Sequence, residues 1–117
     1  MTDFKLSFVK PSSTIKECIQ VIEDSEAKIA LVVDEHEKLL GTITDGDIRR
    51  GILRGMDFNS AAREVMSDQP LYCNQGDSEH LIISKMRQEL VVQLPILDAE
   101  GRVVRLEFLS KLIGAPK

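Results

Sequence analysis

The segment GTITDGDIRRG, residues 41–51, gathers two threonines, two aspartates and two arginines within eleven residues. The hydroxyl of Thr44 and the carboxylate of Asp47, one helical turn later, form a pair that converges on a vicinal diol. A carboxylate accepts two hydrogen bonds at once, which suits the 2′- and 3′-hydroxyls of a ribose. The aspartates argue against a phosphate at this helix start, so a phosphate would lie further along, near a lysine or arginine.

The same residues also describe a well-capped helix start. Thr44 is a good N-cap, and Asp47 three residues later closes a capping box in which Asp replaces the usual Glu. Asp45 and Arg49 are spaced for an i,i+4 ion pair worth ~0.2–0.5 kcal/mol. Gly46 costs up to ~1 kcal/mol in a helix, so we expect a group to approach its backbone closely. On spacing alone, a capped helix and a ligand site are both open.

The surrounding sequence places this segment where a strand passes into a helix. Thr14 and Glu17 fit a capping box and are followed by apolar residues at helical spacing, which predicts a helix over 14–25. Two apolar, β-leaning runs, 28–33 and 39–44, then flank a polar hairpin loop.

The second half of the chain repeats this order of elements. Asp34 and Asp98 each end a predicted strand and open a hairpin, 64 residues apart. Pro95 predicts an edge strand, because proline cannot donate to a sheet ladder. The expected elements of this half are a strand at 71–73, a helix from Ser78, strands at 91–97 and 103–108, and a helical turn at 109–113.

The fold class predicted from this pattern is α/β, a duplicated β-α-β-β-α unit with two small sheets. Half a chain is near the ~40–60-residue limit for independent folding, so we expect the halves to share one core. Phe4 and Phe8 are expected to cover apolar surface from outside. The predicted domains are an N-terminal arm at 1–9, repeat one at 10–55, a linker at 56–69 and repeat two at 70–115.

Composition excludes several classes of function. The chain has 117 residues and a net charge of −4, and its dispersed basic residues argue against nucleic acid as a partner. No apolar run approaches the ~18 residues of a membrane span, and the N-terminus lacks a signal-peptide core, so we expect a cytoplasmic protein. We find no catalytic constellation and predict neither a metal nor a catalytic cofactor. Lone cysteines (Cys18, Cys73) and lone histidines (His36, His80) are interpreted as core and surface residues respectively.

Gly41, Thr44 and Asp47 match the fixed positions of a Gly-h-x-Thr-x-x-Asp motif, where h is usually apolar, and Thr42 fills the apolar position. This motif, with the run ALVVDEHEKLLGTITDGDIRRGIL, resembles the signature of a CBS domain. The resemblance covers about residues 10–115 as two tandem repeats, an arrangement called a Bateman module. It implies two repeats packed as a pseudo-two-fold pair, with clefts that commonly take AMP, ADP or ATP.

Carried over by position, the resemblance implies roles for six residues. Thr44 and Asp47 would hold the ribose, Thr42 and Tyr72 would line the base, and Lys28 and Lys111 would contact phosphate. Alternatively, Tyr72 is an aromatic residue at the core edge, and the two lysines are solvated surface groups.

Repeat two departs from the motif. Arg105, Phe108 and Lys111 stand where the motif has Gly, Thr and Asp, and none of them accepts hydrogen bonds from a ribose diol. We therefore expect one competent site, built on repeat one, and a second cleft that is vestigial or closed by Phe108.

Two kinds of larger enzyme contain similar segments. TDGDIRRGILRG, the following EVM and the strand GRVVRLEFL resemble the N-terminal CBS pair of sugar-phosphate nucleotidyltransferases. Sugar-phosphate isomerases of the arabinose-5-phosphate type also contain a TDGD-type motif that this segment resembles, but their CBS pair follows the catalytic domain. The start at Met1 and the end GAPK favour an N-terminal regulatory piece, with the catalytic domain elsewhere in the parent chain. We expect a homodimer joined through helix faces near 48–53 and 109–113. The alternative function is a structural dimerisation module that binds no ligand.

Overall fold

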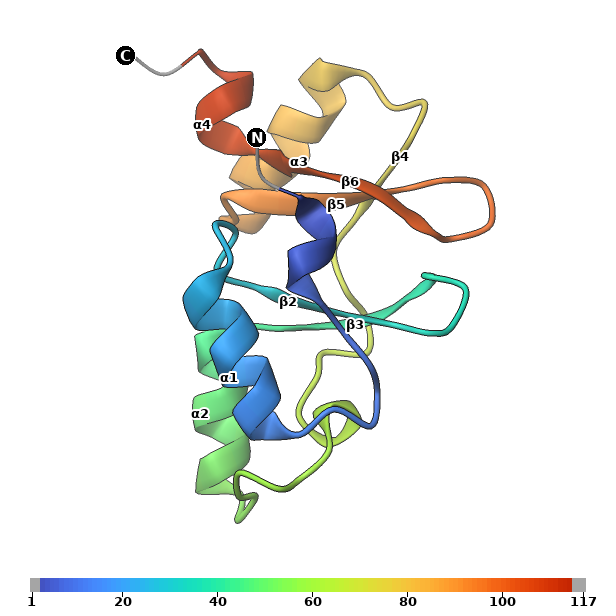
Figure 1. Ribbon diagram of the computed structural model, residues 1–117. Coiled ribbons are helices and arrows are strands. Elements are labelled where there is room, and N and C mark those ends of the chain that lie inside the picture. The colour runs from blue at the N-terminus through green and yellow to red at the C-terminus, as the bar shows by residue number, and fades with distance from the viewer. Residues whose placement is uncertain (1–2, 115–117) are drawn as a thin grey trace. The chain divides into compact units, whose positions relative to one another are not determined.

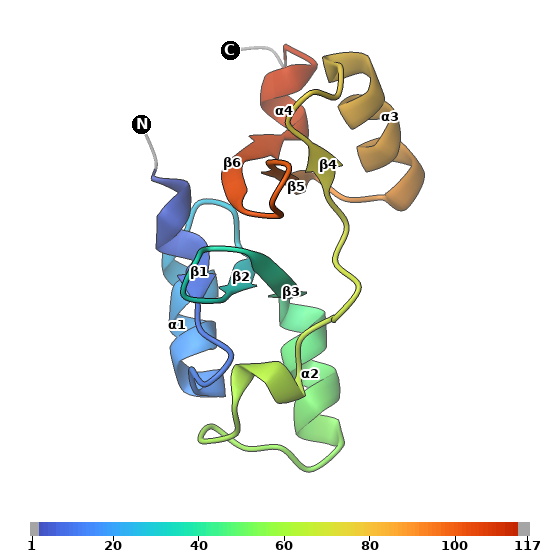
Figure 2. The same ribbon diagram turned by 90° about the vertical axis from the view of Figure 1, so that its right-hand side faces the viewer.

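The computed structural model describes residues 3–114, so the outermost residues of the predicted arm and of repeat two lie outside the described residues. The chain divides into two compact units, Met1–Pro70 and Leu71–Lys117. Each unit contains one three-stranded sheet and its own helices (Figures 1 and 2). The mixed α/β class predicted from the sequence is confirmed.

In the first unit the strands follow the order β1-β2-β3, with β1 parallel and β3 antiparallel to β2. Helices α1 and α2 contact one another and lie side by side (Figure 1). The elements are η1 (Phe4–Ser7), β1 (Phe8–Val9), α1 (Ile15–Asp24), β2 (Ala30–Val33), β3 (Leu39–Ile43), α2 (Asp45–Leu53) and η2 (Ala62–Glu64).

Local sequence explains why α1 forms where it does. The hydroxyl of Thr14 accepts the backbone N–H of Glu17, and the Glu17 carboxylate accepts the backbone N–H of Thr14 at 2.8 Å, which completes the predicted capping box. The apolar side chains at helical spacing, Ile15, Cys18 and Ile22, are buried against the sheet core.

The second unit repeats this plan with the sheet order β4-β5-β6. β4 is parallel to β5, and β5 is antiparallel to β6. The elements are β4 (Cys73–Asn74), α3 (Glu79–Glu89), β5 (Gln93–Leu97), β6 (Val103–Phe108) and α4 (Leu109–Leu112).

The strand registers confirm the 64-residue repeat. In the first sheet Val32 pairs with Gly41, and in the second sheet Ile96 pairs with Arg105, which places each partner 64 residues further along. The hairpin turns also match, because Oδ1 of Asp34 and of Asp98 accepts backbone N–H groups two and four residues later. The duplication is therefore preserved in hydrogen bonding although little sequence identity survives.

The prediction that Pro95 marks an edge strand is wrong. Pro95 lies in β5, the central strand of the second sheet, and pairs with Leu106 of β6. The parallel neighbour β4 pairs only with Ile96 and Leu97. Pro95 therefore lies where β5 extends beyond β4, and a missing N–H is tolerated there.

Two segments outside the predicted first repeat contribute to its structure. The predicted arm reaches residue 9, yet Phe8–Val9 form β1 and Val9 is buried in the core. The predicted linker contributes Ala62 and Val65 to the same core. Phe4 packs edge-to-face on Phe8, with ring centroids 5.8 Å apart.

The lone cysteines and histidines lie as the sequence predicts. Cys18 and Cys73 are buried as free thiols, and burial raises the pKa of Cys18 to about 11. His36 and His80 are exposed. Among residues 3–114, no helix has the length and apolar content needed to cross a membrane.

Gly41 allows the chain to pass closely over β3. A Cβ at this position would lie 2.6 Å from the carbonyl oxygen of Ser67 and 2.6 Å from Sδ of Met66. We expect Gly41→Ala to lower the free energy of unfolding by about 1–3 kcal/mol, because a backbone carbonyl must shift. Denaturant unfolding measures this loss. Gly76→Ala is the control, since a Cβ there meets nothing within 4 Å; equal losses would contradict the close approach.

The turn at Asp98 predicts a loss of stability in acid. The backbone N–H of Arg102 donates to the Asp98 carboxylate and thereby lowers the pKa of Asp98. The Arg102 guanidinium, which donates to the same carboxylate, lowers that pKa further. A lowered folded pKa adds stability above the unfolded value of about 3.9, and that stability is lost as pH falls through the folded value. We expect Asp98→Asn to flatten the fall in thermal midpoint between about pH 5 and pH 2. An unchanged pH profile in Asp98→Asn would contradict the prediction.

Candidate functional site

The candidate site begins at the junction of β3 and α2, where Thr44 is the single residue between strand and helix. Oδ2 of Asp47 accepts the backbone N–H of Thr44 at 3.0 Å and its hydroxyl at 3.1 Å. Oγ1 of Thr44 accepts the backbone N–H of Asp47 at 3.4 Å. The predicted capping box is confirmed, and it fixes the orientation of both candidate ribose-binding side chains.

The second oxygen of Asp47 contacts an arginine. Oδ1 accepts a hydrogen bond from Nη2 of Arg50 at 2.9 Å, in an ion pair where the Asp47 side chain is 16% exposed and that of Arg50 is 62% exposed. The sequence instead predicts a pair between Asp45 and Arg49. Gly46 was the signal that could have identified Arg50, because a Cβ there would lie 3.2 Å from its guanidinium.

Thr42 lies on β3, two residues before Thr44, and is half-buried. Its backbone N–H and C=O pair with Ser67, so the chain after η2 covers this edge of the strand. The backbone of Thr42 is therefore committed to the sheet, and only its side chain is available to a ligand.

Lys28 precedes β2 rather than starting it, since β2 begins at Ala30. Ala30 pairs with Ile43, so Lys28 and Thr44 flank the same end of the β2–β3 ladder. The Lys28 ammonium donates to the carbonyl of Glu23 at the end of α1, and its backbone has φ 57°. A phosphate contact would require Lys28 to leave this carbonyl.

Tyr72 and Lys111 belong to the second unit, and their roles toward a nucleotide stay predictions. Tyr72 precedes β4 instead of lying on it, is 40% exposed, and has the Lys85 ammonium 5.5 Å from its ring centroid. Lys85 also donates to the Tyr72 carbonyl at 2.9 Å. Lys111 lies over the ring of Phe108, 4.6 Å from its centroid.

The second unit lacks the polar junction of the first. Phe108 is the N-cap of α4 and makes no side-chain capping bond, whereas Thr44 caps α2 at the corresponding position. Arg105, which corresponds to Gly41, pairs with Glu107 at 2.7 Å. Among the described residues, this junction therefore has no reciprocal hydroxyl–carboxylate cap like that of Thr44 and Asp47. That it cannot bind a diol, and that Phe108 closes a cleft, stay predictions.

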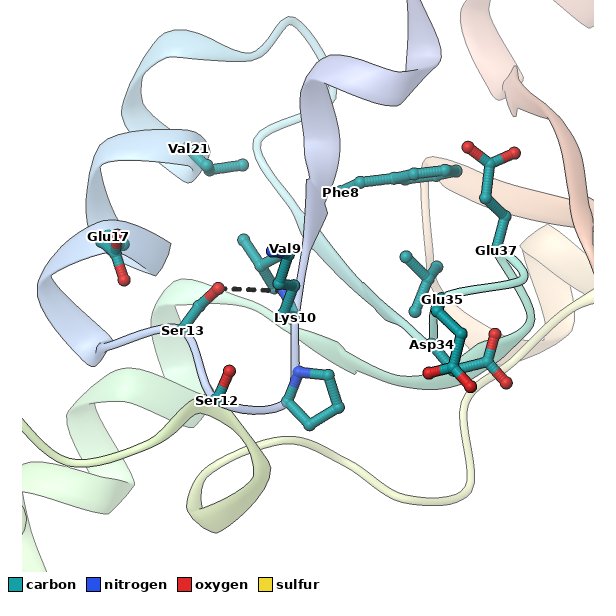
Figure 3. A pocket seen from close by; sticks show the side chains of 12 residues that line it. Phe8, Val9, Lys10, Ser12, Ser13, Glu17, Val21, Asp34, Glu35 and Glu37 are labelled. Carbon is teal, nitrogen blue, oxygen red and sulfur yellow. Dashed lines mark hydrogen bonds between the residues drawn. The ribbon is translucent and has the colours of Figure 1, made fainter.

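A separate cavity of about 990 Å³ lies in the first unit, between the end of β1, the start of α1 and the β2–β3 hairpin (Figure 3). Four carboxylates line it, and each has a neighbour within the unit. Glu17 caps α1, Asp34 accepts from its own turn, Glu37 pairs with Lys5 at 3.4 Å, and Glu35 lies 3.7 Å from the His36 ring. Neither Thr44 nor Asp47 lines this cavity.

The chemistry available at Thr44 and Asp47 is hydrogen bonding to hydroxyl groups. A carboxylate has about four lone-pair positions. Thr44 donates to Oδ2 of Asp47 and Arg50 donates to Oδ1, so a diol that donates two hydrogen bonds would compete with Arg50 for Oδ1. Among the described residues, no group of three or more His, Cys, Asp or Glu side chains is placed to hold a metal ion. The junction is suited to binding a neutral diol.

Comparisons with known proteins match the first part of the chain to a domain family and nearly the whole chain to longer relatives. Residues 1–54 match the CBS domain family. A probable arabinose 5-phosphate isomerase of Haemophilus influenzae is 30% identical to this chain over 91% of its length. The arabinose 5-phosphate isomerase of Francisella tularensis is also 30% identical, over 93% of this chain. An inosine-5′-monophosphate dehydrogenase of Aquifex aeolicus is 26% identical over 93% of it. The chain spans 32%, 33% and 22% of these relatives respectively, about a third of their length or less. The predicted resemblance to nucleotidyltransferases gains no support from them.

Solved structures share the fold of nearly the whole chain. A CBS domain protein from Pyrobaculum aerophilum complexed with AMP has a TM-score of 0.77 and 15% identity, covering 94% of this chain and 84% of that one. The cytosolic domain of the Mg²⁺ channel MgtE in complex with ATP has a TM-score of 0.78 and 21% identity, covering 93% and 44%. Residues 1–54 therefore match the CBS domain family, and the chain has the fold seen in solved CBS domain structures.

Proposed function

We propose that this chain is a non-catalytic regulatory module that binds an adenine nucleotide, AMP, ADP or ATP, by its ribose at Thr44 and Asp47. The observation that carries the proposal is the reciprocal hydrogen bonding of these two residues, which holds a hydroxyl and a carboxylate at one strand–helix junction. The AMP and ATP complexes of two proteins with the same fold support the choice of ligand. Regulation would follow if the nucleotide binds two arrangements of the parent protein with different affinity.

The parent protein is proposed to be a sugar-phosphate isomerase. Two arabinose 5-phosphate isomerases are among the relatives that align with nearly the whole chain, which covers about a third of each. In such a protein the module would act on a catalytic domain that lies outside this chain.

Thermal unfolding with and without nucleotide tests the site. A ligand that binds only the folded state adds about 2.7 kcal/mol at one hundred times its dissociation constant. We expect AMP, ADP or ATP to raise the midpoint of the wild-type chain by several degrees, and Asp47→Ala to abolish that rise. GTP serves as a base control.

The capping box of α1 provides a matched control variant. Glu17→Ala removes the same kind of reciprocal cap as Asp47→Ala, and each variant should lose about 0.5–2 kcal/mol of stability. Only Asp47→Ala should lose the response to nucleotide. The proposal fails if both variants keep the response, or if the wild-type chain has none at millimolar nucleotide.

A ligand-free dimerisation module is the second candidate, and exposed apolar side chains at the end of α2 favour it. Ile52, Leu53 and Phe58 are 42%, 80% and 58% exposed. Ile48 of the same helix is buried in the first unit's core, so it does not contribute to this surface. Ile52 and Leu53 are the last two residues of α2 and Phe58 lies in the following loop. Exposed apolar surface commonly marks a protein interface where it is contiguous, as at Ile52 and Leu53.

Sedimentation equilibrium of the chain and of Leu53→Glu tests the dimer. We expect a self-associating wild type and a dissociation constant at least tenfold higher for Leu53→Glu, because a carboxylate would be buried at the contact. Leu6→Glu is the control, since Leu6 is 61% exposed on η1, away from α2. A monomeric wild type, or equal effects of both substitutions, contradicts this dimer.

A further inference from the structure

We infer that Arg50 is a latch on the ribose site: in the ligand-free chain its guanidinium occupies the outward oxygen of Asp47, and a ribose must displace it to bind. This inference rests on the proposed function. In this inference Arg50 sets the affinity for the ribose, although Arg50 is not one of the fixed positions of the Gly-h-x-Thr-x-x-Asp motif.

The two oxygens of Asp47 have different tasks. Oδ2 accepts both hydrogen bonds from Thr44 and holds the helix start together. Oδ1 has Arg50 as its partner, with Nη2 at 2.9 Å. An incoming diol that leaves the cap intact must therefore bind at Oδ1, where it meets the guanidinium.

Exposure indicates which partner would move. The Arg50 side chain is 62% exposed and extends from the surface of α2, whereas the Asp47 side chain is 16% exposed and held by Thr44. Arg50 can rotate into solvent without breaking another element, but Asp47 cannot move without losing its cap.

Gly46 provides the space for this contact. A Cβ at Gly46 would lie 3.2 Å and 3.3 Å from the two terminal nitrogens of Arg50, tighter than an ordinary contact. The guanidinium therefore lies along the first turn of α2, over a position without a side chain. The contact with Arg50 also explains why a glycine, which has a low intrinsic helix propensity, occupies position 46 of this helix.

The expected strength of the latch is modest. Exposed ion pairs are measured at about 0.2–1 kcal/mol, which corresponds to an apparent dissociation constant raised about 1.4- to fivefold. Salt screens such pairs, so added salt should release the latch and strengthen the binding of a neutral ligand.

Adenosine is the probe that separates ribose binding from phosphate attraction. We expect Arg50→Gln to lower the dissociation constant of adenosine about 1.4- to fivefold, measured by NMR titration at low salt. Gly46→Ala should act in the same direction by crowding the guanidinium, and Arg49→Gln, which removes the same charge one residue earlier, should have little effect. Raising the salt should reduce the difference between wild type and Arg50→Gln.

The outcomes distinguish this inference from the proposed function. If wild type binds adenosine through Asp47 but Arg50→Gln leaves or weakens that affinity, the latch is overturned while the ribose site stands. A variant that loses only AMP affinity also overturns the latch and makes Arg50 a phosphate contact. If wild type binds neither adenosine nor AMP, the proposed function fails and the latch fails with it.

A ligand-free measurement tests the latch independently. A double-mutant cycle with Asp47→Asn and Arg50→Gln on denaturant unfolding should give a favourable coupling at low salt that declines as salt is added. No coupling would overturn the latch even in a chain that binds nucleotide.

Discussion

The reciprocal hydrogen bonds between Thr44 and Asp47 are the interaction on which the first unit's polar junction depends. Thr44 alone separates β3 from α2, and its extended backbone, with φ −115° and ψ 173°, turns the chain from strand to helix. The helix can begin there because the side chain of Asp47 satisfies the Thr44 N–H, one of the donors that helix starts leave open. Folding thus places a carboxylate at the strand end before any ligand arrives.

The second unit has no such exchange at the corresponding junction. Phe108 occupies the corresponding N-cap with no side-chain bond, and the helix after it, Leu109–Leu112, is much shorter than Asp45–Leu53. The strands themselves keep their register, because the hairpin turn at Asp98 retains its backbone hydrogen bonds. Sheet pairing and helix capping are therefore separable, and only capping carries the polar pair.

Predictions from the sequence succeeded where neighbouring residues determine the outcome. Helix starts at Thr14 and Thr44 and the turn at Asp98 depend on contacts within four residues, so the pattern was sufficient. Contacts across the fold were missed. Pro95 is tolerated in a central strand because β4 is too short to pair with it. Val65 is buried because the segment predicted to be a linker packs against the core of the first unit.

The glycine at the middle of β3 has a further consequence for solubility. Unpaired strand edges invite pairing with another chain, and the edge of β3 is covered because Gly41 lets Met66 and Ser67 lie against it. At the corresponding position in β6, Arg105 has a side chain that would obstruct such a cover. Arg105 and Glu107 instead place two charges along β6, the last strand of its sheet among the described residues. Two equivalent strand edges thus have different features that disfavour pairing with another chain. The edge of β3 is covered by the chain's own backbone, and the edge of β6 places two charges along the strand.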